Sequence, residues 1–156
     1  MMLSLGFGSG LPYILLISTT SAWLRDAGVE LSLIGFFAWI TFAYTIKFIW
    51  APLVDRFSVP YFARYGHRKS WIALMQIIII SALLLLSNID PLQSFLFFCI
   101  VAGLIAFAGS FQDIAIDAFR IEYAHISDQG NLAAAYQLGY RLAIIAATSL
   151  ALIFAD

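Results

Sequence analysis

Charged residues are scarce in this sequence, and cysteine and histidine are nearly absent. Only 11% of its 156 residues are charged, against about 25% in a soluble domain, which is too little polar side chain to cover a soluble globule. The single cysteine, Cys99, forms no disulfide framework, and the two histidines form no metal-ligand cluster. The formal net charge of −1 gives no sign of a nucleic-acid partner. The sequence therefore predicts a membrane protein with no metal and no cofactor.

Long apolar runs fill the chain instead. Hydrophobic residues make up 63% of it, and they form runs at about 3–24, 31–54, 70–87, 92–119 and 133–155. Each run is near the ~20 residues that a helix needs to cross a bilayer. The joints between the runs carry most of the charge. We expect an all-α, multi-pass helical bundle over residues 1–156, with the bilayer as its first partner.

The joint after the second run fixes the expected orientation. It holds Arg56, Arg64, Arg68 and Lys69, whereas the first joint holds only Arg25, beside two acids, and the third holds no basic residue. Short loops rich in Lys and Arg stay in the cytoplasm. The N-terminus is therefore expected to be cytoplasmic.

The fourth run contains two carboxylates, Asp113 and Asp117. An ionised carboxylate in hydrocarbon costs several kcal/mol unless it is paired or wetted. If the fourth run is a helix, one of its sides carries small and polar residues, which predicts close packing or a wet cavity there. The other side carries bulky apolar residues, which predicts contact with lipid. The first side holds Ala102, Gly103, Ala106, Gly109, Ser110, Asp113, Asp117 and Arg120, and the second holds Leu104, Ile105, Phe107, Phe111, Ile116 and Phe119.

Charges on three runs share one depth. Lys47, Asp113 and Arg141 lie roughly 6–9 Å to the cytoplasmic side of the middle of their runs. Asp113 could pair with Lys47 or with Arg141, which would avoid an unpaired ion and leave about one surplus positive charge. One interpretation is a fixed salt-bridge network that locks the helices. The other is a site where Asp113 exchanges a proton and the surplus charge holds an anionic substrate.

Two groups of candidate residues follow. Asp117 lies about one turn nearer the cytoplasm than Asp113, where it could meet Arg56 or Arg120, and a structural gate role is favoured for it. The expected substrate and proton pathway consists of Lys47, Tyr44, Asp113, Gln112, Arg141, Tyr140 and Gln137. The expected cytoplasmic gate consists of Asp55, Arg56, Arg68, Lys69, Asp117 and Arg120.

Several motifs carry a resemblance to a known family. They are Leu5-Gly-Phe-Gly-Ser-Gly-Leu-Pro12, Gly35-Phe-Phe, Lys47-Phe-Ile-Trp-Ala-Pro-Leu-Val-Asp-Arg56, Gln112-Asp-Ile-Ala-Ile-Asp-Ala118 and Leu138-Gly-Tyr-Arg-Leu142. In this order they resemble the first five spans of the muropeptide permease (AmpG) family of the major facilitator superfamily, to which the eukaryotic acetyl-CoA transporters are related. The superfamily's loop signature after the second span resembles Leu53, Asp55, Arg56, Gly66, Arg68 and Lys69, with an insertion between the two parts.

The resemblance implies a fold and an activity. The fold is the N-terminal half of a major facilitator bundle, with five of its six spans. The activity is proton-driven import of anionic anhydro-muropeptides across the bacterial inner membrane. The matching loop implies a cytoplasmic gate at Asp55, Arg56, Arg68 and Lys69. Superfamily members have two six-span halves around a central cavity. We therefore expect this chain to be a truncated form that lacks the second half and does not transport alone.

Two alternatives stay open from the sequence. The carrier could move another anionic solute, such as an acyl-CoA. The chain could also be a non-transporting fragment that packs against a partner in the membrane. An enzyme has little support, because the sequence offers no nucleophile–base pair and no metal-ligand set.

Overall fold

The computed structural model describes residues 1–57 and 66–154, with side chains to residue 150. Within these residues the chain is helical, without a strand. The first run forms α1 (Met2–Ile14), the π-helical η1 (Leu15–Thr19) and α2 (Thr20–Asp26). The second forms α3 (Leu31–Phe37), η2 (Ala38–Thr41), α4 (Phe42–Thr45), η3 (Lys47–Ile49) and α5 (Ala51–Arg56). The others form α6 (His67–Leu86), α7 (Phe95–Tyr123), η5 (Ile126–Asp128) and α8 (Gln129–Phe154). Arg64 and the end of the fifth run lie outside the described residues.

Several helical stretches are long and apolar enough to cross a membrane. Three of them, at Met2–Asp26, His67–Leu86 and Phe95–Tyr123, meet that requirement singly, and the second run meets it as one bent pair. The predicted all-α, multi-pass membrane fold is confirmed. Helix α8 covers the fifth run but is not among the helices that meet the requirement, so its crossing stays a prediction.

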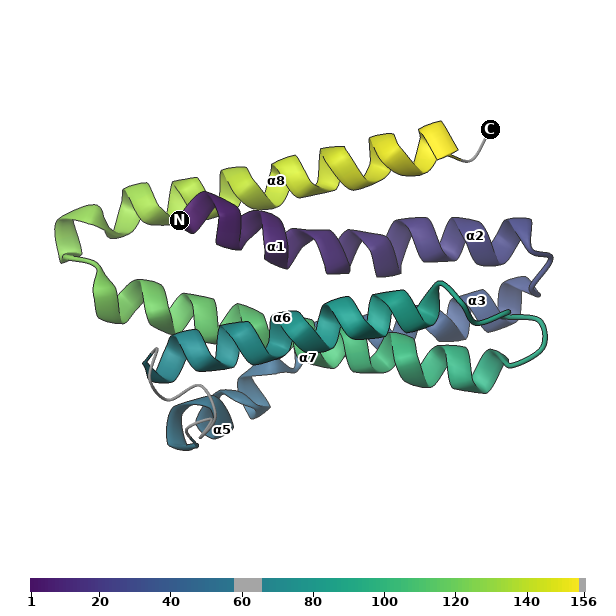
Figure 1. The fold of residues 1–156 in the computed structure, drawn as a ribbon, viewed down its shortest axis with the longest axis horizontal. Helices are drawn as coiled ribbons and strands as arrows, with labels where there is room; N and C mark the ends of the chain where they lie inside the picture. The colour runs from purple at the N-terminus through teal and green to yellow at the C-terminus, as the bar shows by residue number, and fades with distance from the viewer. Residues whose placement is uncertain (58–65, 155–156) are drawn as a thin grey trace.

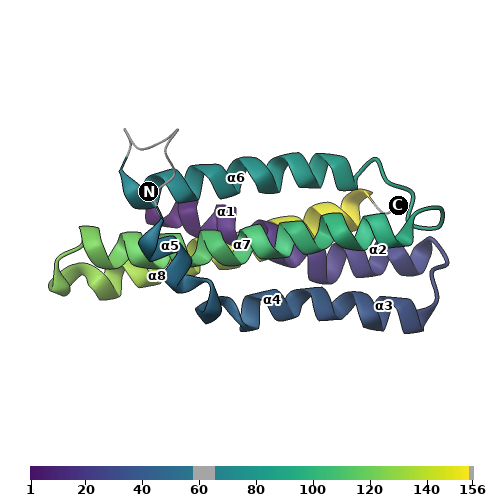
Figure 2. The same cartoon turned by 90° about the horizontal axis from the view of Figure 1, so that it is seen from below.

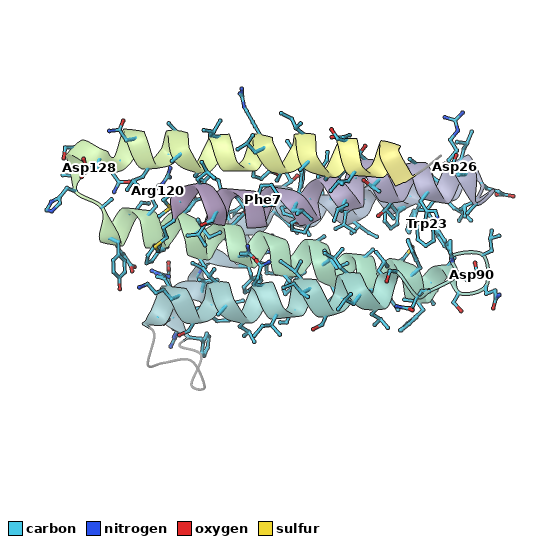
Figure 3. The ribbon with its side chains drawn as sticks, turned by 45° about the horizontal axis from the view of Figure 1, so that its top comes forward. Phe7, Trp23, Asp26, Asp90, Arg120 and Asp128 are labelled. Carbon is cyan, nitrogen blue, oxygen red and sulfur yellow. The ribbon has the colours of Figure 1, made fainter. Side chains whose placement is uncertain are left out.

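Successive spans run in opposite directions along the bundle (Figure 1). One end holds the N-terminus, the start of α6 and the turn from α7 to α8, and the other holds the turns from α2 to α3 and from α6 to α7. In Figure 3, Asp26 and Asp90 lie at one end, while Arg120 and Asp128 lie at the other. The charged joints therefore gather at the two ends of the bundle, as a membrane-spanning fold requires. Which end faces the cytoplasm stays a prediction.

Helix α7 is the centre of the bundle. It lies between α6 on one side and α3–α4 on the other (Figure 2), and it also contacts α1. The expectation that its bulky side faces lipid is wrong for most of that side, because α6 packs there. Four of the six bulky residues are buried, Ile105, Phe111, Ile116 and Phe119, while Leu104 and Phe107 stay exposed.

Helices α1 and α8 approach each other closely through glycines. A Cβ placed on Gly6 would overlap the Tyr136 carbonyl oxygen, and one on Gly139 would overlap the Leu3 carbonyl oxygen. A Cβ on Gly10 would lie 2.9 Å from the carbonyl oxygen of Tyr140. Small residues allow helix backbones to meet in this way, and the contact area then supplies the attraction that lipid does not. The glycine pattern of the first run thus fixes α8 against α1.

The second span is broken in its middle. Its two parts meet at an angle of 43° around Ile46, which has φ −91° and ψ 14°. Pro52 lies in the first turn of α5 and has no backbone N–H to donate to Phe48, four residues earlier, and the 3₁₀ turn η3 precedes α5. The break places Lys47 at the start of η3, where its side chain turns toward α7.

Candidate functional site

Asp113 is the point where three other elements meet α7. The Ser9 hydroxyl of α1 donates a hydrogen bond to Asp113 Oδ1. The Tyr136 hydroxyl of α8 donates to the same oxygen at 3.2 Å. Lys47 Nζ, from the break in the second span, lies 3.9 Å from Asp113 Oδ2. The Asp113 side chain is 13% exposed, so its charge is balanced mainly by these neighbours rather than by water.

The structure decides between the two partners expected for Asp113. It is Lys47 that pairs with this carboxylate, and Arg141 is exposed. The reason is the rotation of α8. Gly139 packs against α1, and a residue two positions further on a helix points roughly 200° away. The expected charge layer therefore holds Lys47 and Asp113 but lacks Arg141.

Four tyrosines form a connected group of rings beside Asp113. The Tyr13 and Tyr44 ring centroids are 5.0 Å apart in an edge arrangement, and Tyr13 and Tyr140 are 6.1 Å apart. Tyr136 and Tyr140 are 6.3 Å apart. Tyr44 and Tyr140 were expected near the site from the sequence, whereas Tyr13, Tyr136 and Ser9 were missed. The spacing of four between Tyr136 and Tyr140 could have indicated that they share a helix face.

A pocket opens between α7 and α8 at this position. We call it the charged pocket. Its volume is about 400 Å³, and Lys47 reaches it from η3. It is lined by Lys47, Asp113, Asp117, Arg120, Ala133, Tyr136, Gln137 and Tyr140. Of the expected pathway residues it thus brings together Lys47, Asp113, Gln137 and Tyr140. Tyr44 joins them through its contact with Tyr13.

Gln112 lies on a different face of α7 from Asp113, in contrast to the expectation. It is 1% exposed and faces a separate pocket of about 390 Å³ between α1, α6 and α7, which Gly8 and Gln76 also line. One residue along a helix turns the side chain by about 100°, so neighbours in sequence need not share a site. The Gln112-Asp113 pair therefore serves two different faces of α7.

The expected gate residues are partly assembled at the end of the bundle. Arg68 joins α5 and α7, because its Nη1 lies 2.6 Å from Asp55 Oδ1 and its Nη2 lies 2.7 Å from Glu122 Oε1. Glu122 was not expected from the sequence. Next to Arg68, the His67 ring nitrogen Nε2 lies 2.8 Å from the Val54 carbonyl oxygen. A single guanidinium thus ties three spans together.

The remaining gate residues do not form one cluster. Lys69 Nζ lies over the rings of Phe119 and Tyr123, at 5.6 and 5.3 Å from their centroids, and Arg56 is exposed. Asp117 pairs with Arg120 at 3.4 Å, which leaves Arg56 outside that pair. The Asp117–Arg120 pair lines the charged pocket, one turn along α7 from Asp113.

Comparison with known proteins identifies a class of membrane transporter. The family model described as Acetyl-coenzyme A transporter 1 matches residues 1–94. The chain belongs to this transporter family.

Individual relatives carry the match over the rest of the chain. The chain is 35% identical over 152 residues to Putative transporter AmpG 4 of Rickettsia conorii. It is 37% identical over 155 residues to the Anhydromuropeptide permease of Escherichia coli K12. These alignments cover 97% and 99% of this chain. They confirm the resemblance to the AmpG permeases that the motifs indicated. The chain spans about a third of the length of these relatives, 37% and 31% respectively.

Proposed function

We propose that this protein is a secondary active transporter of the bacterial inner membrane. In this proposal it imports anionic muropeptides, which are sugar–peptide products of cell-wall breakdown, together with protons. Its partners are the bilayer, the solute, the proton and a second helical bundle that supplies the facing wall of the cavity. The name of the Escherichia coli relative, Anhydromuropeptide permease, supports the choice of solute.

The observation that carries the proposal is the position of Asp113. A largely buried carboxylate meets a lysine at the break of a span, beside a pocket large enough for part of a solute. Ionisable groups inside membrane spans are costly and mark substrate or proton pathways. Broken spans are a recurrent feature of transporter binding sites. A network that only locked the helices would favour ion pairs that are short and fully buried. The Lys47–Asp113 contact is instead 3.9 Å long, and the lysine side chain is 40% exposed.

Proton and anion binding are linked at this pair. While Asp113 is ionised, Lys47 is neutralised by it. When Asp113 takes up a proton, Lys47 is left with an uncompensated positive charge beside the pocket. An anion then binds more favourably, and by linkage the bound anion favours the protonated Asp113 to the same extent. This coupling is the minimum that symport of a proton with an anion requires.

The test is uptake of labelled anhydro-muropeptide by proteoliposomes that contain the protein expressed from its full reading frame. Wild-type protein is expected to accumulate the solute when a proton gradient is imposed. Asp113→Asn keeps the oxygen that accepts from Ser9 and Tyr136 but removes the titrating group. We expect it to lose gradient-driven accumulation while it still exchanges labelled for unlabelled solute.

Other outcomes separate the competing functions. Equal accumulation by Asp113→Asn and wild type would refute proton coupling at this residue. No uptake, together with a stable protein partner recovered from the membrane, would support a non-transporting interaction module instead.

A second solute has its own support. The family model that matches residues 1–94 is described as an acetyl-coenzyme A transporter. Competition decides between the two candidates. Muropeptide uptake that excess acetyl-CoA leaves unchanged supports the first solute, whereas uptake of labelled acetyl-CoA without uptake of muropeptide supports the second.

The cytoplasmic gate is proposed at Arg68 and its two acids. The tie between α5, α6 and α7 closes one end of the bundle, and breaking it would let these spans separate. Rearrangement of ion pairs at helix ends is a known form of gating transition. Asp55 and Arg68 take part directly, and Glu122 joins them.

A further inference from the structure

We propose that Arg120 binds a carboxylate group of the transported solute. The assignment rests on the proposed function and adds to it the residue that receives the charged end of the solute. It also moves Arg120 from the expected gate to the binding site.

Arg120 belongs to the same pocket as Asp113. It lies on α7 near the turn that leads to α8 (Figure 3), seven residues or roughly 10 Å along the helix from Asp113. Its side chain is 23% exposed, so it is partly shielded from water but open to the pocket. A solute that fills the pocket would contact both Lys47 and Arg120, because both line it.

The donors of Arg120 are mostly unused. Its Nε is buried and has no hydrogen-bond partner among the described residues. Its contact with Asp117 Oδ1 is 3.4 Å long, whereas charge-assisted hydrogen bonds are about 2.7–2.9 Å. Arg68 provides the contrast within the same chain, since it meets its two acids at 2.6 and 2.7 Å. Arg68 is arranged as a structural tie, and Arg120 retains donors for another anion.

The backbone that carries Arg120 is held in place. Gln129 Nε2 lies 3.3 Å from the carbonyl oxygen of Arg120 and 3.3 Å from that of Ala124, which fixes the turn between α7 and α8. A guanidinium on a fixed backbone binds a planar anion with less loss of conformational freedom than one on a mobile loop.

The charges of the pocket favour a carboxylate over a phosphate. Lys47 and Arg120 are balanced by Asp113 and Asp117 when both acids are ionised. Protonation of Asp113 leaves one net positive charge, which matches a single carboxylate. A phosphate with close to two negative charges would leave the pocket negative beside Asp117. The flat guanidinium fork also matches a carboxylate with two parallel hydrogen bonds.

The experiment compares two solutes and four proteins. The solutes are an anhydro-muropeptide with free carboxylates and its carboxamide derivative, and uptake is measured in proteoliposomes at one imposed proton gradient. The proteins are wild type, Arg120→Gln, Arg120→Lys and the control Arg25→Gln. Arg25 is an exposed arginine at the end of α2, away from the charged pocket.

Wild type and Arg25→Gln should prefer the acid over the carboxamide by about tenfold or more, as expected for a hydrogen-bonded charge pair. Arg120→Gln should lose this preference while it retains uptake of the carboxamide. Arg120→Lys should keep part of the preference, because it retains the charge but not the fork.

Two results would overturn the assignment. One is an unchanged preference in Arg120→Gln, and the other is an equal loss of both solutes, which would indicate a purely structural role. Binding to purified protein, followed by tryptophan fluorescence, separates this inference from the proposed function. Preferential binding of the acid without accumulation would keep the Arg120 assignment and refute transport. Binding of neither solute would refute both.

Discussion

A single methyl group added at Gly139 should weaken the contact between α1 and α8. The new Cβ of Gly139→Ala would lie 2.8 Å from the Leu3 carbonyl carbon and 3.0 Å from the Phe7 nitrogen, besides overlapping the Leu3 oxygen. These are backbone atoms, so no side chain can rotate out of the way. The two helices would have to separate by roughly 1 Å to restore ordinary van der Waals distances.

The matched control is Gly103→Ala in α7, because a Cβ at Gly103 meets nothing within 4 Å. Both substitutions gain up to about 1 kcal/mol of helix propensity, which cancels in the comparison. Overpacking typically costs about 1–3 kcal/mol. Gly139→Ala should therefore be less stable than Gly103→Ala by about 2 kcal/mol, or at least about 4 °C in Tm for a chain of this size.

The assay is thermal unfolding of purified protein in detergent, with uptake measured in parallel. Separation of α8 from α1 also moves the Tyr136 hydroxyl away from Asp113, so the transport defect should exceed that of Gly103→Ala. Equal Tm values for the two alanine variants, or a higher value for Gly139→Ala, would show that the close glycine contact does not exist in the protein.

Two further predictions concern the ends of the spans. Arg68→Gln should destabilise the fold by about 1 kcal/mol more than Arg56→Gln in the same unfolding assay, because Arg68 is paired with two exposed acids, whereas Arg56 is exposed. Arg68→Lys should be destabilised less than Arg68→Gln but more than wild type. An Arg68→Gln protein as stable as Arg56→Gln would show that the ion pairs of Arg68 do not form. The side-chain amide of Gln129 donates hydrogen bonds to carbonyl groups at the end of α7. Gln129→Ala should therefore lower the free energy of unfolding by about 1 kcal/mol and speed amide hydrogen exchange in the turn between α7 and α8. Exchange that stays as slow as in wild type would contradict the capping role of Gln129.

The sequence was informative wherever a single residue type has few acceptable environments. A carboxylate within an apolar run had to find a cation or water, which singled out Asp113 and one of two cations at the same depth. Gly6 and Gly10 are spaced by about one helical turn, a pattern that is typical of helices that pack closely together. The motifs pointed to the transporter family that the comparisons confirm.

The choice among equivalent partners came from the tertiary structure. Depth along a span allowed both Lys47 and Arg141 to reach Asp113, but the rotation of α8 against α1 turns Arg141 outward. The break at Ile46 brings Lys47 to α7, and no residue count along a straight helix could have shown it. Glu122 joins Arg68 only because α6 and α7 lie side by side.

Hydropathy and the cost of buried charge act on each segment separately, so the sequence alone determined that this is a helical membrane protein with a charged centre in its fourth span. The rotation of each helix about its axis depends on which surfaces interlock. These rotations place Ser9, Tyr136 and Lys47 around Asp113 and turn Gln112 away from it. Only the tertiary structure sets them, because the contact between two helices depends on the shapes of both surfaces at once.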